Sequence, residues 1–104
     1  MEIQYSKYEY RLGDTRTGEY IALSVRHKTD AEKEIKIIKK LAKKEKLKYK
    51  IVALLTGQFI WLIENKKGIE YLEGIECYNT FREAKKNAKE VLKLLTKKIK
   101  VKKR

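Results

Sequence analysis

Residues 69–84, IEYLEGIECYNTFREA, join a strand directly to the start of a helix. Residues 69–78 have the aliphatic and aromatic composition of a strand. After Asn79, the four residues Thr80-Phe81-Arg82-Glu83 form a capping box, in which the threonine hydroxyl and the glutamate carboxylate satisfy backbone amides of a first helical turn. Thr29-Asp30-Ala31-Glu32 repeats the box earlier in the chain. We therefore predict two helices, each beginning at a Thr-x-x-Glu box after a β-hairpin.

Both predicted helices have the periodicity of an amphipathic helix. In residues 30–46 the apolar side chains, including Ile35 and Ile38, share one side, and lysines lie across from them. In residues 81–97 a second apolar side is flanked by a second row of cations. The two basic rows are Lys33, Lys36, Lys40, Lys43 and Lys44 in the first helix, and Arg82, Lys86, Lys89, Lys93 and Lys97 in the second.

The remaining segments predict an antiparallel sheet. Residues 3–12 and 19–27 read as one hairpin, and residues 49–56, 59–63 and 69–78 as a three-stranded meander. The segment 49–56 is apolar on both faces, which is typical of a central strand. The expected fold class is α+β, with about five antiparallel strands and two amphipathic helices in the order ββα-βββα.

The expected domain organisation is a single domain over residues 1–97, followed by a basic tail over residues 98–104. The two halves resemble each other, so residues 3–46 and 48–97 could be repeat units. A chance likeness between two strand-turn-strand-helix segments is an equally open reading. Both faces of such a sheet must be covered. A helix on each face would do this, and so would a homodimer.

The positive charge is concentrated in the predicted helices and the tail. The whole chain has 27 Lys and Arg against 14 Asp and Glu, a net charge of +13. Residues 79–104 hold eleven cations and two acids, whereas residues 51–78 hold two cations and four acids. Like charges three or four residues apart destabilise a helix unless an anionic partner relieves them. Phosphate of DNA or RNA is the commonest such partner.

We therefore predict a small non-enzymatic nucleic-acid-binding protein without cofactor, metal or catalytic residue. Its phosphate contacts are expected from the two basic rows together with Lys100, Lys102, Lys103 and Arg104. An adaptor or regulator that binds an acidic protein, of a viral or mobile-element type, is the alternative. A merely solvated surface, as in the thermophile proteins that this composition resembles, is a third reading.

Other residue types favour structural roles over chemistry. Strand aromatics such as Trp61 are more often core than platforms for stacked bases, although an exposed row could stack them. Cys77 is the only cysteine, which indicates a buried thiol and suits a cytoplasmic protein. His27 is the only histidine, so a site built on two histidines is excluded. No apolar run approaches the length of a membrane span.

A nuclease is the less favoured enzymatic alternative. Glu64-Asn65-Lys66 spells the Glu-x-Lys of metal-dependent nucleases, and Asp14 or Glu19 would have to supply a further carboxylate. The triplet falls in a predicted turn. Small ribonucleases that act through Arg, Lys and Tyr are also left open.

Residues 59–95 resemble the three-stranded-sheet-plus-helix DNA-binding domains of phage integrase arm-binding regions and plant ethylene-response factors. The resemblance rests on the glycine turn Lys66-Lys67-Gly68, a strand, and Thr80-Phe81-Arg82-Glu83-Ala84 before a helix, and residues 10–41 repeat it more faintly. It implies that a sheet face enters the DNA major groove. This chain departs from the pattern because its strands from 51 to 78 carry four glutamates, so we expect the helices to contact phosphate instead.

Overall fold

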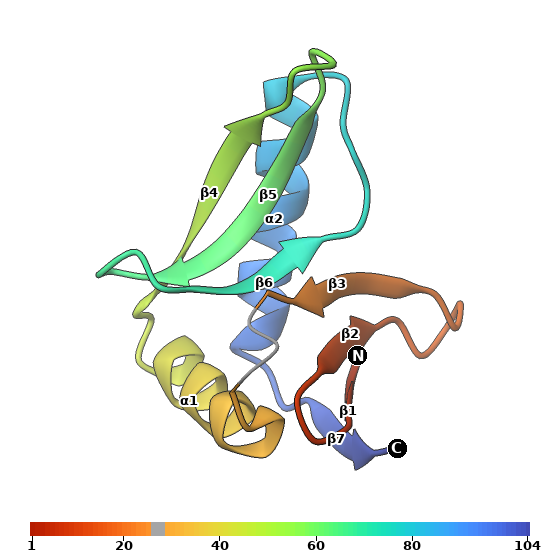
Figure 1. Cartoon of the computed structure of the whole chain (residues 1–104), viewed down its shortest axis with the longest axis vertical. Coiled ribbons are helices and arrows are strands. Elements are labelled where there is room, and N and C mark those ends of the chain that lie inside the picture. Colours follow the sequence, from red (N-terminus) through yellow and green to blue (C-terminus); the bar gives the residue numbers. More distant parts are fainter. Residues whose placement is uncertain (26–28) are drawn as a thin grey trace.

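The computed structural model describes residues 1–25 and 29–104. Within these residues, seven strands and two helices follow one another in the order βββα-βββα-β (Figure 1). The elements are β1 (Glu2–Tyr5), β2 (Tyr10–Gly13), β3 (Tyr20–Ser24), α1 (Ala31–Lys43), β4 (Leu47–Ala53), β5 (Phe59–Asn65), β6 (Glu70–Gly74), α2 (Phe81–Leu95) and β7 (Lys100–Lys103).

All seven strands belong to one mixed sheet with the order β4-β5-β6-β3-β2-β1-β7. The meander β1-β2-β3 and the meander β4-β5-β6 join where β3 pairs antiparallel with β6, and β7 lies parallel to β1. The fold is α+β with two helices. The expected antiparallel sheet of about five strands, in the order ββα-βββα, is wrong, because two strands were missed and one pairing is parallel.

The first strand was missed because the turn that separates β1 from β2 is not evident in the sequence. The expected strand over residues 3–12 is two strands, β1 and β2, which pair antiparallel with Tyr5 opposite Tyr10. The turn between them is closed by a hydrogen bond from the Ser6 amide to the Glu9 carbonyl of 2.9 Å. Residues 6–9 read Ser-Lys-Tyr-Glu and contain no glycine, proline or asparagine, so the sequence carries little turn signal there.

The second missed strand is β7, within the segment expected to be a basic tail. Lys100–Lys103 pairs with β1 in parallel, with Val101 opposite Ile3, and the Arg104 amide donates to the Tyr5 carbonyl at 2.8 Å. Ile99 anchors the segment because its side chain is buried in the core. The cationic side chains do not oppose the strand, since Lys100, Lys102 and Lys103 of β7 are all exposed to solvent.

Strand β4 is an edge strand, whereas the sequence predicted a central one. Its neighbour on one side is β5, and no strand follows it in the sheet order. Lys48 and Lys50 are exposed and alternate with the half-buried Leu47, Tyr49 and Ile51. The apolar residues after Ala53, which the sequence assigned to the same strand, belong to the β4–β5 turn, where Leu55 is fully exposed.

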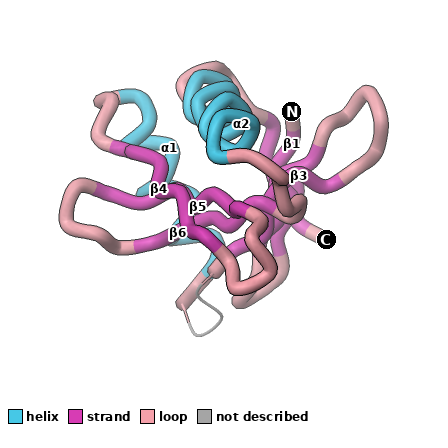
Figure 2. The backbone as a smooth tube through the Cα atoms, turned by 90° about the horizontal axis from the view of Figure 1, so that it is seen from above, coloured by secondary structure: helices cyan, strands magenta, loops and turns pink. Residues whose placement is uncertain are grey.

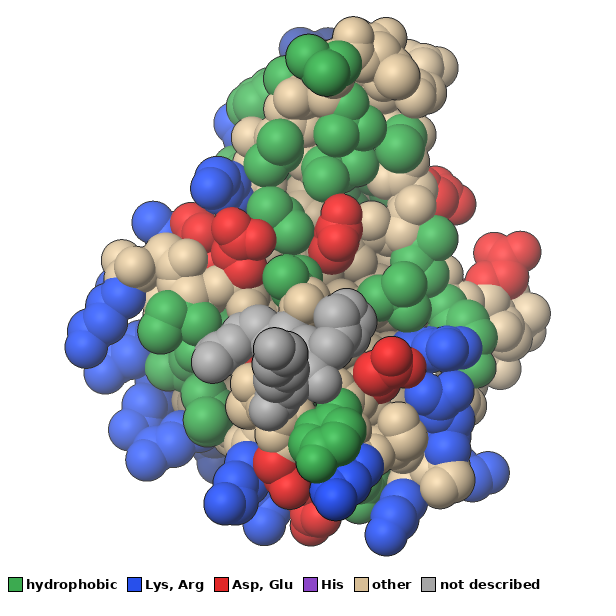
Figure 3. Space-filling view, in the orientation of Figure 1, with side chains coloured by type: hydrophobic (Ala, Val, Ile, Leu, Met, Phe, Trp, Pro, Cys, Tyr) green, Lys and Arg blue, Asp and Glu red, His purple; other side chains and the backbone are tan. Residues whose placement is uncertain are grey.

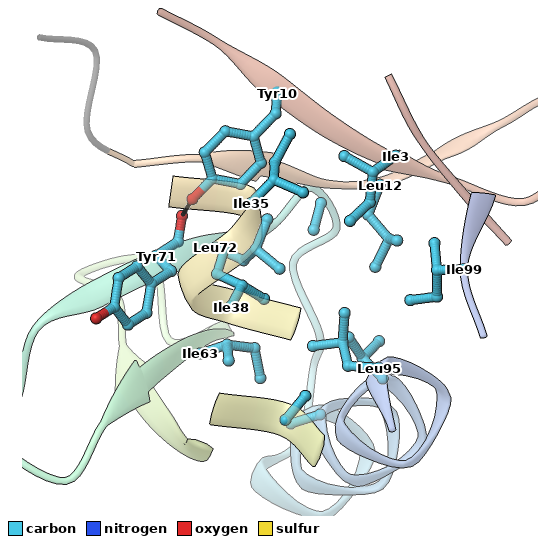
Figure 4. Close-up of a cluster of buried hydrophobic side chains, with 14 of the residues drawn as sticks. Ile3, Tyr10, Leu12, Ile35, Ile38, Ile63, Tyr71, Leu72, Leu95 and Ile99 are labelled. Atoms are coloured by element: carbon cyan, nitrogen blue, oxygen red, sulfur yellow. Dashed lines mark hydrogen bonds between the residues drawn. The ribbon is translucent and has the colours of Figure 1, made fainter. Parts of the chain in front are cut away.

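Both helices pack on one hydrophobic core that also contains side chains from both meanders. Ile35 and Ile38 of α1 and Leu95 of α2 lie in a single buried cluster with Leu12 and Leu72 (Figure 4). Helix α2 lies over the sheet (Figure 2), where it contacts β4 and β5, and α1 also contacts α2. The helices therefore share one core and do not need separate sheet faces.

The two helix starts differ from each other. Thr80 caps α2 as predicted, because its hydroxyl oxygen accepts from the Glu83 amide at 3.1 Å. For α1 the cap is Asp30, whose carboxylate accepts from the Lys33 amide at 3.1 Å, so the predicted Thr29 cap is wrong by one residue. The short carboxylate side chain of aspartate accepts this hydrogen bond from the amide as well as a hydroxyl does. Each helix follows a three-stranded meander, and the possible repeat of residues 3–46 and 48–97 stays a prediction.

Candidate nucleic-acid interface

The basic rows of α1 and α2 lie on the solvent side of each helix. The core takes Ile35, Ile38 and Ala42 from α1, and Ala84, Ala88, Val91 and Leu95 from α2. Because the lysines fall between these positions in the helical period, they cannot reach the core. The ten predicted helix-associated cations are all exposed, namely Lys33, Lys36, Lys40, Lys43, Lys44, Arg82, Lys86, Lys89, Lys93 and Lys97.

Ion pairing separates the two lysines of β4 from the cations of the helices and of β7. Among the described residues, the ion pairs within 4.0 Å join Arg16 to Asp14, Lys48 to Glu64 and Lys50 to Glu70. None of these pairs includes a cation of α1, α2 or β7. The cations of the helices are therefore available to an external anion, whereas the two lysines of β4 already have partners.

The paired lysines lie beside a small acidic group on the sheet. Glu64 of β5 stands opposite Glu70 of β6 in the strand register, and Lys48 of β4 stands opposite Glu64. The Nζ–Oε1 distances are 3.5 Å from Lys48 to Glu64 and 3.8 Å from Lys50 to Glu70. Figure 3 shows carboxylates over β5 and β6, with lysines gathered at the neighbouring edge. This part of the sheet neutralises its own charge.

The C-terminal ends of the two helices border one open groove of about 260 Å³. Its described lining residues are Ala42, Glu45, Leu47, Leu92, Lys93 and Thr96, so Lys93 is the one member of the basic rows among them, and Glu45 places a carboxylate beside it. Helix C-termini carry partial negative charge, which lysines in the last turn offset. The last turns contain Lys40 and Lys43 in α1 and Lys93 in α2.

Strand β7 holds the C-terminal cations in an ordered position. Lys100, Lys102 and Lys103 stand opposite Glu2, Gln4 and Tyr5 of β1, and all are exposed. Side chains of a strand alternate between its two faces, so Lys100 and Lys102 share one face, and Lys103 lies on the other. The cations predicted in a tail thus belong to the edge of the sheet opposite β4.

The tryptophan, the cysteine and the histidine considered in the sequence analysis are not part of this basic surface. Trp61 is 1% exposed, so it belongs to the core and is closed to base stacking. Cys77 is exposed, and the predicted buried thiol is wrong, because residue 77 follows β6 in the loop before α2. His27 lies outside the described residues.

The carboxylates considered for a nuclease lie on separate parts of the fold. Glu64 is buried in β5 and paired with Lys48, while Asp14 and Glu19 belong to the β2–β3 turn, where Asp14 is paired with Arg16. The hydrogen bonds from Arg16 hold the pKa of the Asp14 carboxyl below its usual value. Among the residues that the structure describes, no group of three His, Cys, Asp or Glu side chains is arranged to hold a metal ion.

The sequence did not single out a second cationic group, formed by Lys46, Lys66 and Lys67 around the exposed Ile37 of α1. The one feature of the sequence that could have revealed this group is Ile37, an apolar residue on the polar side of an otherwise regular amphipathic helix. Neither α1 nor α2 has the length and apolarity of a membrane-spanning helix.

Comparison with known proteins finds a likeness in fold. No protein-family model and no curated protein matches the chain. A solution NMR structure of a protein of unknown function, yegP from E. coli, is similar over 98% of this chain and 89% of that chain, with a TM-score of 0.69 and 19% sequence identity. At that identity the likeness shows that the two proteins share a fold, and no more.

Proposed function

We propose that this chain is a small non-enzymatic nucleic-acid-binding protein that contacts phosphates through the exposed cations of α1, α2 and β7. The observation that carries the proposal is the division between free and paired cations. The lysines of β4 have carboxylate partners, whereas the cations of both helices have none among the described residues. Binding to a polyanion would therefore break no ion pair on the helices.

The physical gain comes largely from release of the counterions condensed on the nucleic acid. Each lysine that approaches a phosphate adds to this term, and such contacts fix position without reading sequence. Because both helices pack on one core, the backbone positions that carry their cations are already arranged before binding. We therefore propose binding that depends strongly on salt and weakly on base sequence.

The helix surface is favoured over the sheet surface that the resemblance to integrase arm-binding and ethylene-response-factor domains implies. Glu64, Glu70 and Glu73 lie on β5 and β6, and the lysines beside them are paired. A sheet face with this composition would bring carboxylates towards phosphate. DNA or RNA as the preferred ligand, a homodimer and a cytoplasmic location stay predictions.

A salt series with two matched double variants tests the proposal. Binding of fluorescent duplex DNA, single-stranded DNA and a structured RNA is measured by anisotropy for the full chain. K36Q/K40Q removes two free cations from α1, and K48Q/K50Q removes the same charge from β4. Gln and Lys have similar helix propensity, so the helix variant should keep its fold.

We expect log Kobs to fall linearly with log salt, and the slope to decrease by up to about 1.8 in K36Q/K40Q, since each lost phosphate contact contributes about 0.9. K48Q/K50Q should bind nearly as the unchanged protein does. Absence of binding to all three ligands at low salt would overturn the proposal. Equal losses in the two variants would show that net charge, and not the helix surface, determines binding.

A further inference from the structure

An open groove lies between α1 and the turn that joins β5 to β6. Its volume is about 480 Å³, within the range of roughly 300–1,000 Å³ found for ligand pockets. Ile37 and Leu41 of α1 line one side, and Ile69 and Tyr71 line the other. Ile37 is 46% exposed and Ile69 is 41% exposed, so two large aliphatic side chains face solvent across the same groove.

The β5–β6 turn is held in a fixed shape by Asn65. The Asn65 side-chain oxygen accepts from the amides of Lys67 and Ile69, each at 2.9 Å, and its side-chain nitrogen donates to the Tyr71 hydroxyl at 3.2 Å. Gly68 has a φ of +85°, a conformation that glycine adopts without strain. These contacts order the wall that carries Ile69, so little entropy would be lost on binding.

The rim of the groove is cationic. Lys46, Lys66 and Lys67 line it, and no carboxylate is among its described lining residues. On α1, Lys33 and Lys40 lie four residues before and three after Ile37, and therefore on the same side of the helix. Figure 3 shows apolar side chains bordered by lysines at this edge of the molecule.

We propose that this groove binds an acidic peptide segment of a partner protein, with apolar side chains of the peptide seated between Ile37 and Ile69 and its carboxylates on the surrounding lysines. The charge of the rim excludes a cationic peptide. A second copy of this chain, with a net charge of +13, would be repelled. This site goes beyond the proposed nucleic-acid function and does not depend on it.

A peptide is favoured over an unpaired base because of the groove lining. Bases bind by stacking on open aromatic faces. The one aromatic residue among the described lining residues is Tyr71, which is 4% exposed and has its hydroxyl engaged by Asn65. The accessible surface is aliphatic, which suits leucine or isoleucine side chains in a helix-in-groove arrangement.

Two synthetic peptides of equal charge and about 15 residues test the inference. One carries glutamates with leucines at helical spacing, and the other has serine in place of each leucine. Their binding to the full chain is measured by anisotropy and mapped from backbone amide shifts in NMR spectra. We expect the leucine peptide to bind about tenfold tighter than the serine peptide, with shifts centred on residues 37–41 and 65–71.

The matched variants are I37S/I69S, which removes the two exposed groove residues, and Ile75→Ser, which removes an equally exposed isoleucine outside the groove. I37S/I69S should lower the affinity for the leucine peptide to that of the serine peptide and leave the salt-dependent nucleic-acid binding unchanged. Ile75→Ser should change neither.

Equal binding of the two peptides, or shifts away from the groove, would overturn the inference. A single-stranded oligonucleotide that shifts the groove amides and is lost in I37S/I69S would also overturn it, in favour of a base-binding site. Failure of all nucleic acids to bind, with the leucine peptide still preferred, would remove the proposed function and leave this site standing.

Discussion

The indole ring of Trp61 on β5 lies against the backbone of Gly74 on β6. A methyl group added at Gly74 would stand 2.5 Å from Cε2 of Trp61 and 2.8 Å from its Nε1. Trp61 is 1% exposed, so the ring has no room to move aside. The absence of a side chain at position 74 is therefore what allows this tryptophan into the core.

Gly74→Ala should destabilise the protein, because the added carbon must displace either the ring or the strand. Overpacking of this kind costs about 1–3 kcal/mol in the free energy of unfolding. Urea denaturation followed by Trp61 fluorescence measures the change. Gly13→Ala is the control, since the added carbon there meets its nearest atom at 3.6 Å and Gly13 has no positive φ. A Gly74→Ala protein as stable as the Gly13→Ala protein would contradict the packing described.

The cap of α1 can be assigned by comparing two neighbouring variants. Asp30→Ala should lower the free energy of unfolding by about 1 kcal/mol, because the Lys33 amide loses its acceptor. Thr29→Ala should have little effect, since the Thr29 side chain does not cap the helix. Thermal denaturation followed by circular dichroism distinguishes the two. A larger loss in Thr29→Ala would restore the capping box that the sequence pattern indicates.

The helices could be predicted from sequence because their signals are local. The 3.6-residue period and a cap within one turn fix α1 and α2 to within a few residues. The sheet depends on contacts that are distant in sequence. Apolar and cationic residues alternate in residues 98–104, as in a strand. The segment forms β7 only because β1 offers an unpaired edge and the core accepts Ile99. Charge alone suggested a free tail.

The candidate site, too, could be predicted from sequence only where its signals are local. Exposure of the helix lysines follows from the helical period, so Lys36 and Lys89 could be placed on the surface from sequence. Which lysines are already paired depends on the register of β4, β5 and β6, which brings Lys48 opposite Glu64. The groove needs Ile37 and Ile69 to meet across the fold, and no local pattern joins them.

Strand β7 can be tested through the residue that anchors it. Ile99→Ala should destabilise the protein by about 2–5 kcal/mol, the range for truncating a buried isoleucine, and should speed hydrogen exchange at the β7 amides. Val101→Ala, at a side chain that is 40% exposed, should cost much less. If the β7 amides exchange freely in the unchanged protein, the segment is a tail as its charge suggests, and the strand is not formed in solution.

Tyr10 joins α1 to both meanders through its hydroxyl. The hydroxyl donates to the Tyr71 carbonyl at 3.0 Å (Figure 4) and contacts the buried Glu34 carboxyl of α1. Tyr10→Phe should cost about 1–3 kcal/mol, because buried polar groups lose a partner while the ring still fills its place. Tyr8→Phe, at a side chain that is 45% exposed, is the control in the same denaturation experiment. Equal stability of the two variants would show that the buried hydroxyl contributes nothing.

Tyr78 should make the protein less stable at high pH. Burial raises the pKa of its phenol above the ordinary value of 10.0, helped by the charges of Glu76, Glu90 and Glu83, and the Trp61 indole opposes the rise. Because the folded state holds this proton more tightly than the unfolded state, the contribution is fully present below pH 10 and is lost as pH rises through the folded pKa.

Tyr78→Phe has no phenol to ionise, so the gap in stability between it and the unchanged protein should shift in favour of the variant above pH 10 and stay constant below. Denaturation midpoints measured for both proteins from neutral pH upward give this difference directly. E76Q/E90Q removes two of the neighbouring charges and should make the loss of stability above pH 10 smaller, because less repulsion opposes the phenolate and the folded pKa then lies nearer to the unfolded value. A difference that does not change with pH would show that the phenol titrates alike in the folded and unfolded states.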